Sequence, residues 1–129
     1  MKGWGYARTK LDRARLRLHG ATRITRTYTI GDTPMVVEAG NPRELSRIKA
    51  YVRKEPETVE WINAHVQTGN VFYDIGANVG MYTIWAAITA GVRVYSFEPE
   101  SQNYAILTEN IRLNNLQNSV TAFCTAISD

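Results

Sequence analysis

A short loop of small residues, flanked by two acidic side chains, is the part of this sequence with the clearest chemical meaning. The loop runs from Gly76 to Gly80, follows the apolar stretch Val71–Ile75, and is followed directly by a helical pattern. Asp74 lies just before the loop, and Glu98 ends a second apolar stretch eighteen residues after Gly80. A strand, a glycine-containing loop and a helix N-terminus in this order favour a nucleoside-containing cofactor.

Each of these groups suits one part of S-adenosylmethionine, which carries an adenosine, a positive sulfonium and an amino-acid head with both charges. The loop has backbone N–H groups at a helix N-terminus, which suit the carboxylate of that head. Gly76 and Gly80 allow close approach of a ligand, and Asn78 tolerates a left-handed backbone. Asp74 suits the ammonium, directly or through water, and the two oxygens of Glu98 can accept the ribose hydroxyls.

Pro99 and the segment that follows a third predicted strand are expected beside the adenine. Pro99 turns the chain directly after the second apolar stretch, and Ile127–Asp129 follow the third. No metal ligands and no catalytic residue are assigned, since neither histidine has a second ligand or a credible role as a base. The predicted cofactor-binding residues are Asp74, Ile75, Gly76, Ala77, Asn78, Gly80, Glu98, Pro99, Ser128 and Asp129.

From residue 67 onward, strands and helices alternate, which predicts an α/β fold with a parallel sheet and right-handed crossovers. Val71–Ile75 is apolar at nearly every position, as is typical of a strand covered on both faces. Cys124, the only cysteine, is expected as a small buried hydrophobe. The predicted strands are Val71–Ile75, Val92–Phe97 and Ser119–Cys124, and the predicted helices are Met81–Ala90 and a helix from a Ser101 cap to about Asn114.

The segment before the sheet is predicted to form a hairpin and two short helices. Residues 23–30 alternate in polarity, Gly31-Asp32 is a two-residue turn signal, and Met35–Glu38 returns as the second strand. Helices are expected from near Pro42 to Val52 and from Glu57 to about Val66. The predicted organisation is a basic arm over 1–22, a hairpin and helical lead-in over 23–66, and the sheet region over 67–129.

The charge of the chain is uneven, although its net value is only +3. Residues 1–30 hold eight basic residues and one acidic residue, whereas residues 31–129 hold seven basic and eleven acidic residues. A basic arm therefore precedes a mildly acidic domain. We expect no nucleic-acid partner and at most weak contact of the arm with a membrane surface. No secretory signal and no stretch long enough to span a bilayer is found, so a cytoplasmic location is expected.

Four motifs in order resemble those of the FkbM-type methyltransferases: Asp74–Gly80, Phe97–Glu100, Asn110–Asn114 and Ala126–Asp129. The resemblance covers the chain from about residue 55 to its end. It implies the class I, Rossmann-like fold, of which this chain holds the strands in the order 3-2-1, with S-adenosyl-L-methionine as the cofactor. It also implies methyl transfer to an oxygen, often on a sugar, glycan or secondary metabolite.

The resemblance further implies four later strands that this sequence does not contain. We therefore expect the N-terminal half of a methyltransferase domain, truncated after its third strand and acting on a small-molecule or glycan acceptor. Val71–Ile75 is then an exposed apolar edge, suited to self-association or to pairing with another chain. Two alternatives are an NAD-binding oxidoreductase fragment and a non-catalytic module that pairs with another chain. The dinucleotide-binding motif G-x-G-x-x-G would need glycine at positions 78 and 81, where this chain has Asn78 and Met81, which argues against the first.

Overall fold

The computed structural model describes residues 24–30, 33–39, 46, 48, 50, 51 and 55–128. The predicted basic arm over 1–22, the turn Gly31–Asp32 and the candidate site residue Asp129 lie outside these residues. Of the first predicted helix, residues 46, 48, 50 and 51 are helical, and its other positions also lie outside the description.

A β-hairpin comes first in the described chain, as predicted. Strand β1 (Ile24–Ile30) pairs antiparallel with β2 (Thr33–Ala39), with Ile24 opposite Ala39 and Ile30 opposite Thr33. Met35 and Val37 of β2 are fully buried. They are two residues apart and therefore lie on the same face of the strand, which packs against the rest of the protein.

A three-stranded parallel sheet with the strand order β3-β4-β5 carries the remainder of the chain. One helix connects each strand to the next, so the α/β fold and the predicted strand order are confirmed. Among the described helices, none combines the length and the apolarity needed to cross a lipid bilayer. The strands are β3 (Val71–Ile75), β4 (Arg93–Phe97) and β5 (Val120–Phe123), and the helices are α3 (Pro56–His65), α4 (Met81–Ala90) and α5 (Ser101–Leu113).

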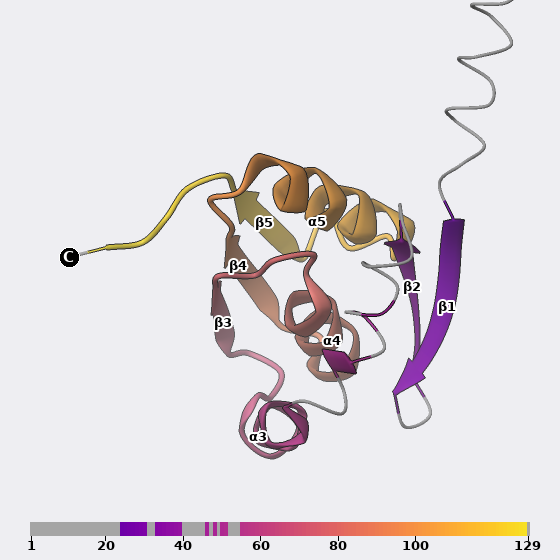
Figure 1. Cartoon of the computed structure of the whole chain (residues 1–129). Coiled ribbons are helices and arrows are strands. Elements are labelled where there is room, and N and C mark those ends of the chain that lie inside the picture. Colours follow the sequence, from indigo (N-terminus) through magenta and orange to yellow (C-terminus); the bar gives the residue numbers. More distant parts are fainter. Residues whose placement is uncertain are drawn as a thin grey trace, which may run out of the picture.

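The core lies between the sheet and two helices. α4 and α5 cover one face of the sheet, and the hairpin packs on the far side of these helices (Figure 1). Val94 of β4, Ile84 of α4 and Leu107 of α5 are fully buried in this layer. α3 packs against α4 and buries Val59 and Ile62. The helices that connect the strands therefore also supply most of the apolar surface that the sheet buries.

The opposite face of the sheet is exposed within the described residues. Val71, Tyr73 and Ile75 of β3 are 49%, 60% and 63% exposed, and the stacked rings of Tyr73 and Tyr95 lie 5.5 Å apart on this face. The prediction that β3 is covered on both faces is therefore wrong for the described chain, because both connecting helices pack on the same side. β3 is also an edge strand, as predicted.

Two local predictions are wrong. The sequence predicts Ser101 as the N-cap of α5, but the cap is Glu100, whose carboxylate accepts hydrogen bonds from the amides of Gln102 (3.0 Å) and Asn103 (2.7 Å). A glutamate can take this role because its longer side chain folds back over the first turn. Cys124 follows the end of β5 and is exposed rather than buried.

Gly80, at the start of α4, is expected to tolerate alanine less well than Gly91, at its end. Both have a positive φ (86° and 62°), so alanine strains either backbone by about 1–2 kcal/mol. A Cβ at Gly80 would also clash with Cδ1 of Leu107, whereas a Cβ at Gly91 would meet nothing within 4 Å. In urea denaturation we expect Gly80→Ala to lower the free energy of unfolding by about 1–3 kcal/mol more than Gly91→Ala. Equal losses would contradict this account of the packing.

Candidate cofactor-binding site

The candidate site lies where β3 and β4 end side by side. Gly76 and Ala77 follow β3, and their amides both donate to the carbonyl oxygen of Phe97, at 2.9 and 3.0 Å. Phe97 is the last residue of β4, so the start of the loop is fixed to the end of the neighbouring strand. The carboxyl ends of parallel strands are where open α/β sheets bind ligands. The loop over residues 76–80 therefore occupies the expected place for a ligand site.

Glu98 holds the middle of the loop from the end of β4. Its side chain is 5% exposed, and its Oε2 accepts a hydrogen bond from the amide of Asn78 at 2.7 Å. Its Oε1 accepts from the amide of Glu100 at 3.0 Å and from the side-chain amide of Asn103 at 3.4 Å. A carboxylate offers about four lone-pair positions, so roughly one remains for a ribose hydroxyl. The structure brings Glu98 and the loop together and adds a bracing role that the sequence did not predict.

The amides of the loop are already hydrogen-bonded within the protein. Besides the amides of residues 76, 77 and 78, that of Val79 donates to the side-chain oxygen of Asn78 (2.9 Å) and that of Gly80 to the carbonyl of Ala77 (2.8 Å). The tight fold of the loop uses these amides in this conformation, and their binding of a cofactor carboxylate stays a prediction. An anion would instead meet the first turn of α4, whose N-cap Gly80 makes no side-chain cap.

Gly76 forms the open surface of the loop. It is exposed, its φ is 78°, and a Cβ at this position would meet nothing within 4 Å. Asn78 has a φ of 52°, the left-handed conformation that its residue type tolerates. The backbone next to Glu98 is therefore bare of side chains on its outer side, and a ligand can lie directly against it.

Asp74 points into the core rather than toward this open surface. It is buried, and its carboxylate accepts a hydrogen bond from the hydroxyl of Thr83 on α4. The Thr83 hydroxyl is in turn 2.7 Å from that of Ser96 on β4. Burial raises the pKa of Asp74, and its hydrogen bonds with Thr83 oppose this shift. Asp74 therefore ties β3 to α4 under the loop, and its contact with a ligand ammonium stays a prediction.

The remaining predicted site residues differ in how close they lie to the loop. Ala77 is buried within it, and Ile75 and Pro99 are exposed at the ends of their strands. Ser128 is exposed, and the segment after β5 runs away from the sheet (Figure 1). The structure thus assembles the residues at the ends of β3 and β4 and does not bring Ser128 to them. Asp129 lies outside the described residues.

Several polar residues that shape the site were not predicted. Thr83 and Ser96 are buried on largely apolar elements, and a polar residue within an apolar stretch is the sequence signal that could have indicated them. Tyr82 donates to Glu55 at 2.7 Å and packs edge-on against Tyr51, a long-range contact with no local signal. Burial and the hydrogen bond to Glu55 raise the pKa of Tyr82, so this phenol is a poor general base. Within the described ranges, no three acidic, histidine or cysteine side chains gather as a metal site requires.

Comparison with known proteins finds that the chain is similar to methyltransferases. The model of the TRM5/TYW2 methyltransferase domain matches residues 36–128. The 31-O-demethyl-FK506 methyltransferase FkbM of Streptomyces tacrolimicus is 33% identical over 85 residues, which cover 62% of this chain and 30% of that protein. The resemblance to FkbM-type enzymes is thereby confirmed, and the chain spans about a third of the length of this curated relative.

Solved structures share the fold. TYW2 of M. jannaschii in complex with AdoMet has a TM-score of 0.59 and 22% identity, covering 78% of this chain and 43% of that one. An RNA methyltransferase from Salinibacter ruber in complex with S-adenosyl-L-homocysteine has a TM-score of 0.51 and 22% identity, covering 57% and 47%. At this level of identity, these similarities establish the class I methyltransferase architecture alone.

Replacement of Asp74 by asparagine is expected to remove a pH-dependent loss of stability. Because the pKa of Asp74 is raised above its ordinary value of 3.8 in the folded state, the folded protein binds this proton more tightly than the unfolded chain. Wild-type stability relative to Asp74→Asn should therefore fall as the pH rises from about 3.8 through the raised pKa, and then level off.

Thermal or urea unfolding of both proteins across this pH range measures the effect. Asparagine keeps an acceptor for the Thr83 hydroxyl, so the comparison isolates the buried charge. A stability difference that does not change with pH would show that Asp74 ionises in the folded protein as it does in the unfolded chain.

Proposed function

We propose that this chain binds S-adenosylmethionine as the cofactor-binding half of a methyltransferase, because it belongs to the TRM5/TYW2 methyltransferase domain family. The observation that carries the proposal is the 2.7 Å hydrogen bond between Glu98 and the Asn78 amide, beside the bare backbone of Gly76. The similar structures from M. jannaschii and S. ruber contain AdoMet and S-adenosyl-L-homocysteine. The division of the chain into a basic arm over 1–22, a hairpin and helical lead-in over 23–66, and the sheet region over 67–129 remains part of this proposal.

Each part of the cofactor meets a different group in this proposal. A ribose hydroxyl donates to the position that remains on Glu98, and the adenosine lies along Gly76. The carboxylate of the amino-acid head lies at the N-terminus of α4, which has no side-chain cap. The cofactor supplies an electrophilic methyl group, and these residues hold it in a fixed orientation toward an acceptor.

A hydroxyl on a small molecule or glycan is the acceptor class we propose first. Its support is the 33% identity to the FkbM enzyme, whose name describes methylation of an oxygen. RNA is the second candidate, and it is favoured by the RNA methyltransferases among the similar structures. These similarities weaken the expectation that nucleic acid is not a partner. Transfer of a labelled methyl group to bulk tRNA or to hydroxylated small molecules, assayed with the full-length protein, separates the two.

Cofactor binding is expected to depend on Glu98 and not on the neighbouring Glu100. Glu98→Gln and Glu100→Gln each remove one negative charge from the same turn, but only Glu98 faces the loop. In calorimetric titration of the full-length protein with S-adenosylmethionine, we expect Glu98→Gln to weaken binding about tenfold or more. Glu100→Gln should stay within about twofold of wild type.

NAD is the matched comparison ligand for this titration. The wild-type protein should bind S-adenosylmethionine without measurable NAD binding, since Asn78 and Met81 replace the glycines of the dinucleotide motif. Preference for NAD, or equal effects of the two glutamine variants, would contradict the proposed cofactor role of Glu98.

The exposed edge of β3 is the second feature for which we propose a role, namely pairing with another strand. Tyr73 on this strand is 60% exposed, and an apolar edge strand is a template for association. Sedimentation of the 129-residue chain should show association that grows with concentration. Tyr73→Lys should shift it toward monomer, whereas Ala105→Lys, on the exposed face of α5, should not. A monomer at every concentration would contradict the proposal.

A further inference from the structure

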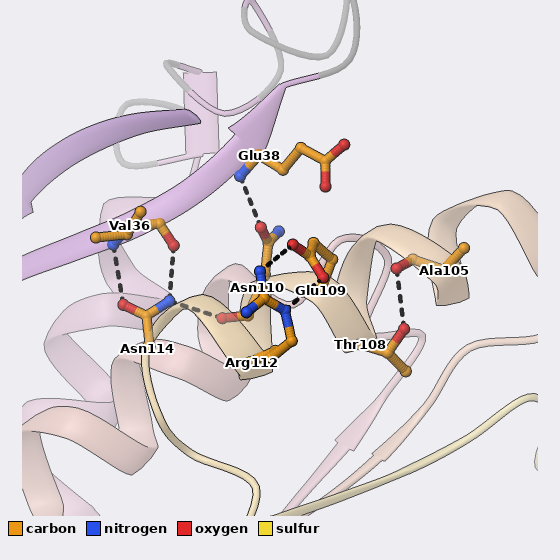
Figure 2. A network of polar contacts seen from close by, with 8 residues as sticks. All are labelled: Val36, Glu38, Ala105, Thr108, Glu109, Asn110, Arg112 and Asn114. Carbon is orange, nitrogen blue, oxygen red and sulfur yellow. Dashed lines mark hydrogen bonds and ion pairs between the residues drawn. The ribbon is translucent and has the colours of Figure 1, made fainter. Parts of the chain in front are cut away.

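Two asparagines of α5 dock the β-hairpin onto the body of the protein. Asn114 accepts a hydrogen bond from the Val36 amide at 2.9 Å and donates one to the Val36 carbonyl at 2.6 Å. It therefore contacts the outer edge of β2 as a neighbouring strand would, and Figure 2 shows its side chain facing both backbone atoms of Val36. One helical turn earlier, Asn110 faces the amide of Glu38 on the same strand (Figure 2).

Asn110 makes one contact that Asn114 does not make. Its Oδ1 accepts from the Glu38 amide at 2.7 Å, while its Nδ2 donates to the carbonyl of Val79 at 2.8 Å. Val79 belongs to the loop of the candidate site, directly before the N-cap Gly80 of α4. A single side-chain amide thus joins the hairpin to the cofactor loop, across 72 residues of sequence on one side and 31 on the other.

The surroundings of Asn110 leave these contacts little freedom. Asn110 is fully buried, so neither the Glu38 amide nor the Val79 carbonyl can readily exchange this partner for water. Leu107, one turn earlier on α5, is also fully buried, and its Cδ1 lies close under Gly80. α5 therefore supports the C-terminal end of the loop by packing at Leu107 and by a hydrogen bond at Asn110, while Glu98 holds the middle of the loop.

We propose that Asn110 is a positioning residue for cofactor binding, which holds the Val79–Gly80 end of the loop through its hydrogen bond to the Val79 carbonyl. This inference rests on the proposed function, because the ligand whose affinity it concerns is S-adenosylmethionine or its product. Asn110 acts through the loop backbone and the start of α4, and it touches no reacting atom. The Glu38 amide of the hairpin contacts the same side chain and helps to fix its orientation toward the loop.

Asn114 supplies the matched control, since it docks the same strand without reaching the loop. The experiment compares Asn110→Ala and Asn114→Ala in the full-length protein, with S-adenosyl-L-homocysteine binding measured by calorimetry at a temperature where both variants are folded. We expect Asn110→Ala to weaken binding about tenfold and Asn114→Ala to stay within about twofold of wild type. Affinities of the two variants within twofold of each other would overturn the proposal.

Hydrogen exchange of the ligand-free proteins shows whether Asn110 holds the loop itself or only stabilises the hairpin. Asn110→Ala should speed exchange in a peptide over residues 76–84, whereas Asn114→Ala should speed it only in β2. Unchanged exchange in the loop of Asn110→Ala would overturn the proposal. If the wild-type protein binds no S-adenosyl-L-homocysteine, the proposed function fails, and the exchange comparison still decides whether Asn110 positions the loop.

A second variant covers the case in which Asn110→Ala does not fold. Asn110→Asp has nearly the same size and keeps an acceptor for the Glu38 amide, but an ionised carboxylate cannot donate to the Val79 carbonyl. It should therefore retain the docked hairpin and reproduce the faster exchange of the loop. Asn110→Asp with wild-type exchange in residues 76–84 and wild-type affinity would overturn the proposal as well.

Discussion

A hydrogen bond from a loop amide to a buried carboxylate is the interaction on which the rest of the site depends. The carboxylate of Glu98 accepts a hydrogen bond from the Asn78 amide at 2.7 Å. The carbonyl of the preceding residue, Phe97, accepts hydrogen bonds from the amides of Gly76 and Ala77. Fixing a loop backbone costs about 1–2 kcal/mol per residue in conformational entropy, and charge-assisted hydrogen bonds help to offset this cost. The single shape that results leaves Gly76 bare on its outer side and starts α4 at Gly80.

The buried polar side chains beneath the loop are also hydrogen-bonded to one another. Asp74, Thr83 and Ser96 form a buried chain of hydrogen bonds from β3 through α4 to β4, and Asn110 extends the support to the hairpin. Among the described residues, no buried side-chain nitrogen or oxygen lacks a hydrogen-bond partner. Such networks specify one geometry because any displacement leaves a polar group unpaired in a poorly solvated place. The loop is thus held by Phe97 and Glu98 at its start and middle and by Asn110 of α5 near its end.

Much of this architecture could be predicted from the sequence, because it is encoded by local patterns. The alternating apolar stretches predict the strands and α4, and the glycines with Glu98 predict a ligand site at the strand ends. The partners of the loop amides and the direction of Asp74 could not be predicted, since they depend on Phe97 and Thr83, which the loop meets only in the folded state. The apolar run of β3 is equally compatible with one covered face or two, so the exposed side of Tyr73 was missed. Asn110 and Asn114 were recognised as part of a motif, but their contacts with β2 join segments more than 70 residues apart.

At the ends of β3 and β4, the loop, the N-terminus of α4 and the partly free carboxylate of Glu98 form the site that we propose for a sulfonium cofactor. A crystal structure of the full-length protein with S-adenosyl-L-homocysteine tests this most directly. We predict a ribose hydroxyl within hydrogen-bond distance of Glu98, with the bond between Glu98 and the Asn78 amide still intact. A ligand bound elsewhere, or a Glu98 side chain turned away from both the loop and the ribose, would contradict it.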